Sequence, residues 1–432
     1  MVATAHPLGD GDHVTAPNGI SARYEGAVLI DGTGDDPIPG SVLIVDGGGT
    51  ITYAGAADAA PPQDATPVVD LSGLTLLPGF FDCHVHFGLG GDMMSSLRNM
   101  AAPPSLRSFE TAHRMRETLH AGITTARDLG GIDAGYRQAQ QRGLLEGPRL
   151  RVAGRMLGPT GGHSDFTLPD GSCPDPGLGS VVDTPEQARR ESRTLLRDGA
   201  DWLKVCATGG MSTPSDDPED VGLDEETIRI VVGEAADRRR DGVAAHSQGT
   251  VGIHNALRAG VTSLEHGYGL DRQGSELMLR NGTVLVPTLS AALRMPERGT
   301  VPDYLWQKKH RWADRCRSNI AEAVAAGVPV VLGTDSGIGP HANNLEELRH
   351  LVDVGLSPLE AIKAGTGDSA RVLGLRDQVG TLSAGMLADF VVTDVDPLRD
   401  IAELADPAAV VLVAQAGEIR KNTLGSRAAS VS

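Results

Sequence analysis

The sequence predicts an α/β protein built around a (β/α)8 TIM barrel, with a small β-sandwich domain that both chain termini form together. Two observations carry this prediction. From residue 76 to about residue 375, short apolar strands alternate with longer amphipathic segments, a pattern typical of parallel βα units. On both sides of this span, short strands are separated by glycine turns, which indicates a small sheet domain.

The domain boundaries follow from the same change of pattern. We expect a flexible arm at residues 1–20, which are rich in Gly, Asp and Pro. The β-sandwich domain is expected to combine residues 21–77 with residues 380–432, and the barrel to occupy residues 78–379. A barrel of this type typically needs about 250 residues, which fits the span.

Eight strand candidates lie in the barrel span. The first ends at His86, and the others are residues 122–128, 150–154, 202–206, 242–246, 261–266, 284–287 and 328–335. Helical patterns between them include residues 185–197, 224–240, 251–259 and 311–326. The carboxyl ends of barrel strands meet at one mouth, where such folds place their chemistry. Polar residues at those ends are therefore the first candidates for function.

Charge and composition exclude several classes of partner. The chain has 56 acidic and 38 basic residues and a formal net charge of -18, which argues against nucleic acid. No apolar run is long enough to span a membrane, and the first residues lack the pattern of a signal peptide. We therefore expect a cytoplasmic protein with no membrane partner. The four cysteines show neither a zinc nor a disulfide pattern and are predicted to be reduced core thiols.

The histidines of the segment Asp82-Cys83-His84-Val85-His86 are spaced for metal binding. In an extended strand alternate side chains share a face, so His84 and His86 point the same way. Such a pair can hold a metal ion. Alone, the pair could equally be two polar residues at a strand end, so the interpretation depends on further ligands.

Further ligand types stand at four other strand ends. They are Lys204, His246, His266 and Asp335. Lys204 is the only lysine before Lys308, in a chain that otherwise uses arginine there. A buried lysine can lose its proton and act as a nucleophile, which arginine cannot. If its amine adds carbon dioxide, the resulting carbamate can bridge two cations, so the set predicts a two-metal site.

These motifs resemble those of the amidohydrolase superfamily of metal-dependent hydrolases. The resemblance runs from about residue 23 to residue 422. The matching pieces are Asp82-Cys83-His84-Val85-His86, Trp202-Leu203-Lys204-Val205, Ala244-Ala245-His246, Glu265-His266-Gly267 and Gly333-Thr334-Asp335-Ser336-Gly337. Pieces such as Thr160-Gly161-Gly162-His163 and Pro340-His341-Ala342-Asn343-Asn344 resemble the branch with prolidase-like, imidazolonepropionase-like and ochratoxinase-like enzymes.

The resemblance implies a role for each ligand. His84 and His86 would hold one metal with Asp335, and His246 and His266 would hold the other. N6-carboxylated Lys204 would bridge the two, together with a hydroxide. Asp335 would then accept the hydroxide's proton and pass it to the leaving amine, and His163 would stabilise the oxyanion or the substrate carbonyl.

Four residues are candidates for substrate contact: His163, His341, Tyr268 and Arg127. Each has a competing interpretation. His163 could cap a loop, His341 could simply be solvated, and Tyr268 could pack in the core. Arg127 could form a structural ion pair with the adjacent Asp128 or recognise a substrate carboxylate.

The sequence thus predicts a binuclear amidohydrolase that cleaves an amide bond in a small molecule. Dipeptides, N-acyl amino acids and similar carboxylate-bearing amides, including ochratoxin-type amides, are the expected substrates. A cyclic amide or lactone hydrolase on the same metals is the alternative, and a catalytically silent scaffold is a third, which the complete ligand set disfavours. Zinc is the first candidate metal for a histidine-rich site, with manganese, cobalt and iron left open. A homo-oligomer is expected by analogy with the family.

Overall fold

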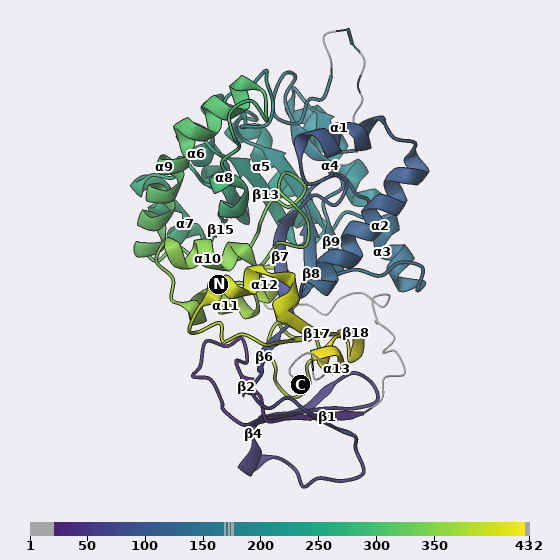
Figure 1. Cartoon of the computed structure of the whole chain (residues 1–432). Coiled ribbons are helices and arrows are strands. Elements are labelled where there is room, and N and C mark those ends of the chain that lie inside the picture. The colour runs from purple at the N-terminus through teal and green to yellow at the C-terminus, as the bar shows by residue number, and fades with distance from the viewer. Residues whose placement is uncertain (1–20, 168–169, 172, 174–176, 428–432) are drawn as a thin grey trace.

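The computed structural model describes residues 21–167, 170–171, 173 and 177–427. The predicted flexible arm, residues 1–20, lies outside the described residues. Figure 1 shows helices arranged around a set of strands in the upper part of the molecule and a part built mostly of strands below it. Strands from both ends of the sequence, coloured purple and yellow, share this lower part.

Two sheets make up the lower part. One has the order β4 (Ile51–Ala56), β3 (Ser41–Val45), β1 (Ala22–Glu25), β5 (Val68–Asp70). The other has the order β18 (Glu418–Asn422), β17 (Val410–Gln415), β16 (Phe390–Thr393), β6 (Thr75–Pro78), β2 (Val28–Leu29). Their buried apolar side chains form one core, in which the rings of Tyr24 and Phe390 meet edge to face at 5.0 Å. Burial of this shared face holds together segments that are far apart in sequence, while the exact domain boundaries stay a prediction.

The upper part contains two parallel sheets. The larger has the order β11 (Gly179–Val181), β10 (Met156–Gly158), β12 (Trp202–Cys206), β13 (Gly242–Ser247), β14 (Ser263–His266), β15 (Val284–Val286). The smaller has the order β7 (Phe80–Val85), β8 (Ile123–Asp128), β9 (Arg149–Val152). Every strand pair in both sheets is parallel. The parallel strands predicted from the sequence are therefore present.

The eighth predicted strand, residues 328–335, differs from the prediction. It is not a regular strand and makes isolated bridges from Val330 to β15 and, one residue beyond its end, from Ser336 to β7. Backbone hydrogen bonds still run from this segment to both neighbours: Val331 N to Leu285 O is 3.0 Å, and Cys83 N to Leu332 O is 2.9 Å. Pro329 has no N–H to donate, which weakens a ladder here. The segment joins the two sheets, and a continuous eight-stranded barrel stays a prediction.

The third predicted strand is shorter than expected. Residues 150–154 were expected to form a strand, but β9 ends at Val152, and a further strand that was not predicted, β10, begins at Met156. Gly154 between them has φ of 78°, which breaks an extended strand. β9 pairs with β8 and β10 pairs with β12, so these two consecutive strands belong to different sheets.

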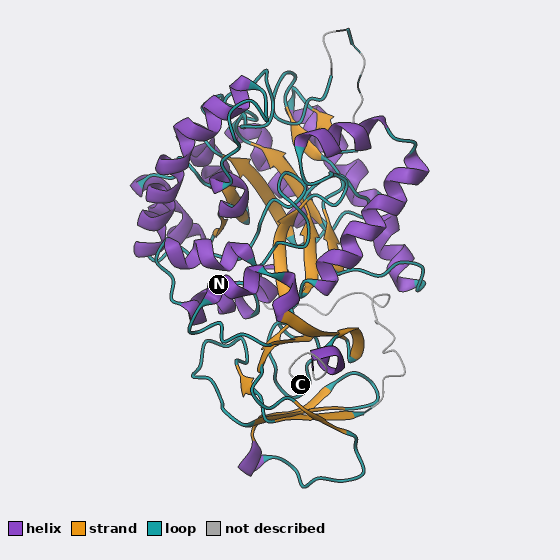
Figure 2. Ribbon diagram, in the orientation of Figure 1, coloured by secondary structure: helices purple, strands orange, loops and turns teal. Residues whose placement is uncertain are grey.

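Helices lie outside the strands, as Figure 2 shows in purple and orange. They are α1 (Met93–Ala101), α2 (Pro104–His120), α3 (Ala134–Gln141), α4 (Pro185–Arg197), α5 (Glu225–Asp237), α6 (Thr250–Ala259), α7 (Arg272–Asn281), α8 (Leu289–Leu293), α9 (Asp303–Ala325), α10 (Glu346–Asp353), α11 (Pro358–Ala364), α12 (Gly367–Val372) and α13 (Leu424–Arg427). Helix α4 begins with a capping box of Thr184 and Gln187, followed by Pro185 in its first turn. Short 3-10 helices cover Ala57–Ala59, Ile401–Ala405 and Pro407–Ala409.

Within the described ranges, no helix combines the length and apolar character needed to cross a membrane. All four cysteines are free; Cys83, Cys206 and Cys316 are buried as expected, whereas Cys173 is exposed and does not belong to the core.

Candidate metal centre

Three predicted ligands meet where β7 ends. His84 lies on this strand and His86 directly follows it, and their Nε2 atoms lie 3.6 Å and 3.4 Å from Oδ1 of Asp335. The ligand atoms of the three residues all lie within 4.8 Å of one another, and all three side chains are buried. Gly333 permits this approach, because a Cβ there would lie 2.2 Å from Val286 and 3.1 Å from His84. Imidazole and carboxylate at this spacing can hold one divalent cation.

The remaining two histidines adjoin this group. His246 on β13 and His266 on β14 come from neighbouring strands, and their rings lie 4.5 Å apart. The ring of His266 is also 5.0 Å from that of His84. The four imidazoles thus form one buried cluster, as the ends of parallel strands predict.

Lys204 projects from β12 and is 1% exposed. Its Nζ has no hydrogen-bond partner among the described residues, and neither has Oδ1 of Asp335. Burial lowers the pKa of the Lys204 amine to about 8, although the charges of Glu265 and Asp335 act in the opposite direction. Burying an amine without a hydrogen-bond partner costs free energy, so we expect Nζ of Lys204 to have a bonding partner in the active enzyme.

Burial also sets the protonation of the histidines. It lowers the pKa of His266 to about 3 and those of His84 and His246 well below the ordinary value. For His86 burial acts in the same direction, but the adjacent Asp335 carboxylate outweighs it and raises the pKa. Burial alone would raise the pKa of Asp335, yet His86 and His84 hold it well below its usual range. Neutral imidazoles and an ionised carboxylate are the forms that bind metal.

One nitrogen of each histidine is held by the protein. Nδ1 of His84 lies 2.8 Å from Oε2 of Glu265, and Nδ1 of His86 lies 2.8 Å from the carbonyl oxygen of Gly130. Nδ1 of His266 lies 2.8 Å from the Thr288 hydroxyl, whereas His246 uses Nε2, at 3.0 Å from the Gly209 carbonyl. Such bonds fix the ring and leave the other nitrogen for a ligand. His246 would therefore bind through Nδ1 and the other three through Nε2.

Two of the ligand residues have unusual backbones. His266 and Asp335 adopt positive φ values of 70° and 60°. This left-handed conformation is unfavourable for residues with a side chain and is enriched at functional sites. Here it turns the chain at the strand end.

Glu265 is the residue that sequence analysis missed. It is fully buried, and it joins His84 to Arg127, whose Nη2 lies 2.9 Å from Oε1 of Glu265. The only signal was its place directly before His266. Alternation along an extended strand predicts that Glu265 faces away from its neighbour His266. The positive φ of His266 breaks this alternation, and both residues lie beside His84.

The contact of Arg127 with substrate stays a prediction, and no ion pair joins Arg127 to Asp128 among the described residues. Arg127 is fully buried and donates to Cys83 O, Ser263 Oγ and Glu265 Oε1, at 2.6, 3.0 and 2.9 Å. Its guanidinium also lies 4.4 Å from the ring of Trp202. Asp128 instead accepts backbone N–H groups of Phe87 and Gly130. Because each of its three nitrogens makes a hydrogen bond and its surface is covered, Arg127 supports the site from within.

The other three substrate candidates lie near the cluster. The His163 ring stacks on that of His246, with centroids 4.0 Å apart. The Tyr268 hydroxyl lies 3.0 Å from that of Thr288, and Tyr268 is 2% exposed. His341 places Nε2 2.9 Å from the Leu89 carbonyl, and burial lowers its pKa to about 4. Their contact with substrate stays a prediction, and Tyr268 and His341 are already bonded to protein groups.

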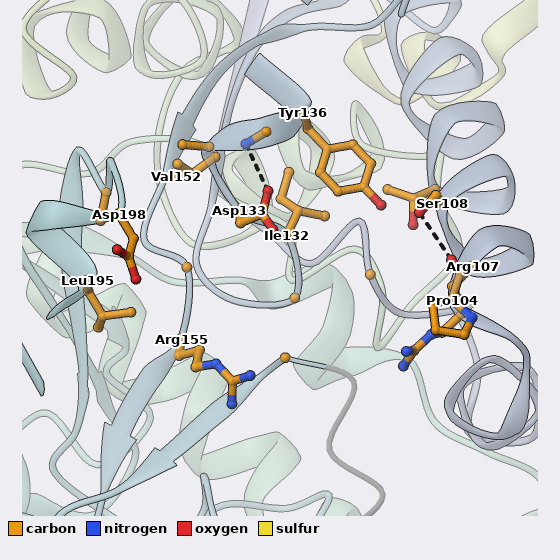
Figure 3. A pocket seen from close by; sticks show the side chains of 18 residues that line it. Pro104, Arg107, Ser108, Ile132, Asp133, Tyr136, Val152, Arg155, Leu195 and Asp198 are labelled. Carbon is orange, nitrogen blue, oxygen red and sulfur yellow. Dashed lines mark hydrogen bonds between the residues drawn. The ribbon is translucent and has the colours of Figure 1, made fainter. Parts of the chain in front are cut away.

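A cavity of about 590 Å³ lies elsewhere, beside α2, α3 and α4. Figure 3 shows Tyr136 and Ser108 on one side of it and Leu195 and Asp198 on another. None of the six predicted metal ligands lines this cavity. Its position therefore adds nothing to the chemistry of the metal centre.

Comparison with known proteins identifies the family. The profile of the amidohydrolase family matches residues 75–420, most of the chain. The chain belongs to the amidohydrolase family. The ochratoxinase of Aspergillus niger is 32% identical over 423 residues, covering 93% of this chain and 87% of that protein. Among solved structures, a prolidase complexed with N-methylphosphonate-L-proline has a TM-score of 0.85 and 30% identity, covering 93% of this chain and all of the other.

A third similar protein is a Xaa-Pro dipeptidase with bound methionine in its active site. Its TM-score is 0.84 and its identity 29%, covering 92% of this chain and 99% of that one. As a member of the amidohydrolase family with hydrolases among its relatives, the chain is an enzyme of the hydrolase class, and hydrolytic amide cleavage is its general chemistry. The family generally depends on two metal ions, and the group of His84, His86 and Asp335 provides ligands for one.

Proposed function

We propose that this amidohydrolase cleaves the amide bond of a carboxylate-bearing small molecule at a two-metal centre. The observation that carries the proposal is the buried cluster of four imidazoles and Asp335, with the unpartnered amine of Lys204 near enough that its charge acts on His84, His246 and His266. His84, His86 and Asp335 would hold one metal and His246 and His266 the other. Zinc is the first candidate because imidazole nitrogens dominate the set.

Lys204 supplies the bridge in this proposal. Its neutral amine adds to carbon dioxide, forming a C–N bond and releasing one proton, and becomes an anionic carbamate with two oxygen atoms. The pKa of about 8 keeps a substantial fraction of the amine neutral near pH 7 to 8. An unmodified ammonium would instead repel two cations, so the same residue cannot serve the site uncarboxylated.

Asp335 moves the proton. Two divalent cations, when bound, would lower the pKa of a water molecule and polarise the substrate carbonyl. His86 and His84 hold the pKa of Asp335 well below its usual range, so the carboxylate is ionised and can accept a proton from the attacking water. The same carboxylate then delivers that proton to the leaving amine. His163 supplies the group that orients the carbonyl oxygen.

The similar proteins favour carboxylate-bearing amides as the substrate class. Names such as ochratoxinase, prolidase and Xaa-Pro dipeptidase refer to proteins that share about 30% of their residues with this chain over more than 90% of its length. We further propose that the two parallel sheets close into one eight-stranded barrel through residues 328–336, which places all six ligands at one mouth.

The test combines metal content with activity. Purified protein would be analysed for bound metals and assayed with Xaa-Pro dipeptides, N-acyl amino acids, ochratoxin-type amides and a lactone. We expect about two metals per chain and amide cleavage, both lost in Lys204→Ala and retained in the surface variant Lys363→Ala. Preference for the lactone would favour the alternative substrate class. Absence of metal and of turnover would point to a silent scaffold and overturn the proposal.

A further inference from the structure

The loop that follows β12 is held by one face of α9. Tyr304, Lys308, Arg311 and Arg315 follow one another at helical spacing along this helix. Each of these side chains contacts the loop: Tyr304 Oη donates to Ser212 O at 3.0 Å, Arg311 pairs with Asp217, and Arg315 pairs with Glu219 at 2.6 Å. The helix therefore determines the course of residues 210–219.

Lys308 makes the most demanding of these contacts. It is 8% exposed, and its ammonium donates to the carbonyl oxygens of Gly210, Thr213 and Asp216, at 3.1 and 2.6 Å for the first two. An ammonium group has three hydrogens, and each finds an acceptor on this loop. Nζ also lies 3.6 Å from Oδ1 of Asp216. A buried lysine with this set of partners fixes the backbone of residues 210–216 and compensates the charge of Asp216.

Asp216 connects this loop to the metal centre. The residue is 6% exposed, and its Oδ2 accepts the N–H of Gly210 at 3.0 Å and lies 3.3 Å from Nδ1 of His163. The Thr213 hydroxyl lies 3.2 Å from the same ring nitrogen. Two side chains of one loop thus converge on Nδ1 of His163. Nε2 has no hydrogen-bond partner within the described residues, which leaves it as the ring atom available to a substrate.

The ring of His163 is packed as well as hydrogen-bonded. It stacks at 4.0 Å and 17° on His246, one of the proposed metal ligands. The ring also lies against Gly210, where an added Cβ would be 2.2 Å from Cε1 of His163. The ring can therefore take this position only because residue 210 is a glycine.

We propose that Asp216 and Lys308 are positioning residues for His163. Lys308 fixes the loop, and Asp216 on that loop holds the imidazole over His246 so that Nε2 meets the substrate carbonyl. The role in catalysis rests on the proposed function, while the positioning of the ring does not. If the α9 contacts served only to stabilise the loop, loss of Arg311 or Arg315 would affect activity as much as loss of Lys308. If Lys308 acts through His163, only its loss lowers activity, and this difference makes the inference testable.

The kinetic test uses a double-mutant cycle. We expect Asp216→Ala to lower kcat by about 10- to 100-fold with a smaller change in KM and unchanged metal content, because misplacing a catalytic group affects the transition state most. In the His163→Ala background the same change should have no further effect, because Asp216 acts through His163. Independent, multiplicative losses would overturn the inference.

Matched variants separate positioning from loop stability. Lys308→Met should lower kcat to a similar extent as Asp216→Ala. Lys308→Arg should retain much of the activity, because it keeps the positive charge and the N–H donors. Arg311→Ala and Arg315→Ala remove exposed ion pairs of the same loop and should leave kcat close to wild type. Gly210→Ala should lower kcat as well, since it displaces the ring directly. Equal losses in all five variants would identify a structural role only.

A spectroscopic measurement tests the positioning without any substrate. In protein labelled with 15N-histidine, the His163 signals are those missing from His163→Ala. We expect these signals to shift in Asp216→Ala and in Lys308→Met and to stay unchanged in Arg311→Ala. Unchanged signals in Asp216→Ala would contradict the inference even if the enzyme hydrolyses amides. Shifted signals in a protein that cleaves none of the substrates would support the positioning while the proposed function fails.

Discussion

Nη2 of Arg127 lies 2.9 Å from Oε1 of Glu265, and the other oxygen of this carboxylate lies 2.8 Å from Nδ1 of His84. Arg127 and Glu265 are both fully buried. The pair sits directly behind a proposed metal ligand, so it sets the orientation of that ligand through charge-assisted hydrogen bonds. Ser263 supports both members, since its hydroxyl bonds with each of them.

Glu265→Gln should weaken metal binding. The amide keeps the size of the side chain but lowers the basicity it confers on His84, and loss of such a partner typically costs about 10- to 100-fold in metal affinity. Competition with a chelator, followed by metal analysis, measures the change. The exposed Glu276→Gln serves as a control that should bind metal like the wild type. Equal affinities in the two variants would show that Glu265 does not tune the site.

Arg127→Met should destabilise the fold. It leaves the buried Glu265 without its cation, a change that typically costs about 3 to 5 kcal/mol. Urea unfolding of the metal-free protein measures the loss, and Arg272→Ala, on the surface of α7, should unfold like the wild type. If Arg127→Met were instead stable and impaired only in KM, Arg127 would after all be a substrate contact.

Gly333→Ala should disrupt the metal centre. The new Cβ would lie 2.2 Å from Cγ1 of Val286 and 3.1 Å from Cβ of His84, so the strand end must move. Overpacking of this kind costs about 1 to 3 kcal/mol, and we expect reduced metal content with a lower unfolding midpoint. Gly233→Ala is the matched control, because Gly233 lies in α5 with open space beside it. There alanine should stabilise by about 0.5 to 1 kcal/mol.

Glu347 should make stability depend on pH. Burial raises the pKa of this carboxyl to about 7, although Ser290 and Leu289 donate hydrogen bonds that act to lower it. In the unfolded chain a glutamate loses its proton near pH 4.3. Between these values the folded state binds more protons than the unfolded one, so stability falls as the pH rises from about 4.5 to 7.

The expected contribution is at most about 4 kcal/mol across that range. Unfolding of wild type and Glu347→Gln at several pH values measures it, and the difference in stability between the two should change in favour of the variant as the pH rises. Parallel pH curves would mean that folded Glu347 is ionised throughout the range.

Which residues the strand ends offer follows from the amino-acid sequence alone. His84, Lys204, His246, His266 and Asp335 could be picked out because alternation along a strand and the common direction of parallel strands are local properties of the sequence. The pairing of strands from early and late in the sequence followed in the same way from the short strands on either side of the barrel span. These features need no knowledge of distant contacts.

Contacts between side chains that are far apart in the sequence became visible only in the tertiary structure. Arg127 turned out to bond with Glu265, 138 residues away, and not with its neighbour Asp128. Lys308 reaches a loop more than 90 residues earlier, and through Asp216 that loop reaches His163. The separation of β9 from β10 and the bridging eighth segment likewise depend on pairing with two different sheets. Side-chain pairs of this kind are set by packing in three dimensions, and sequence spacing does not encode them.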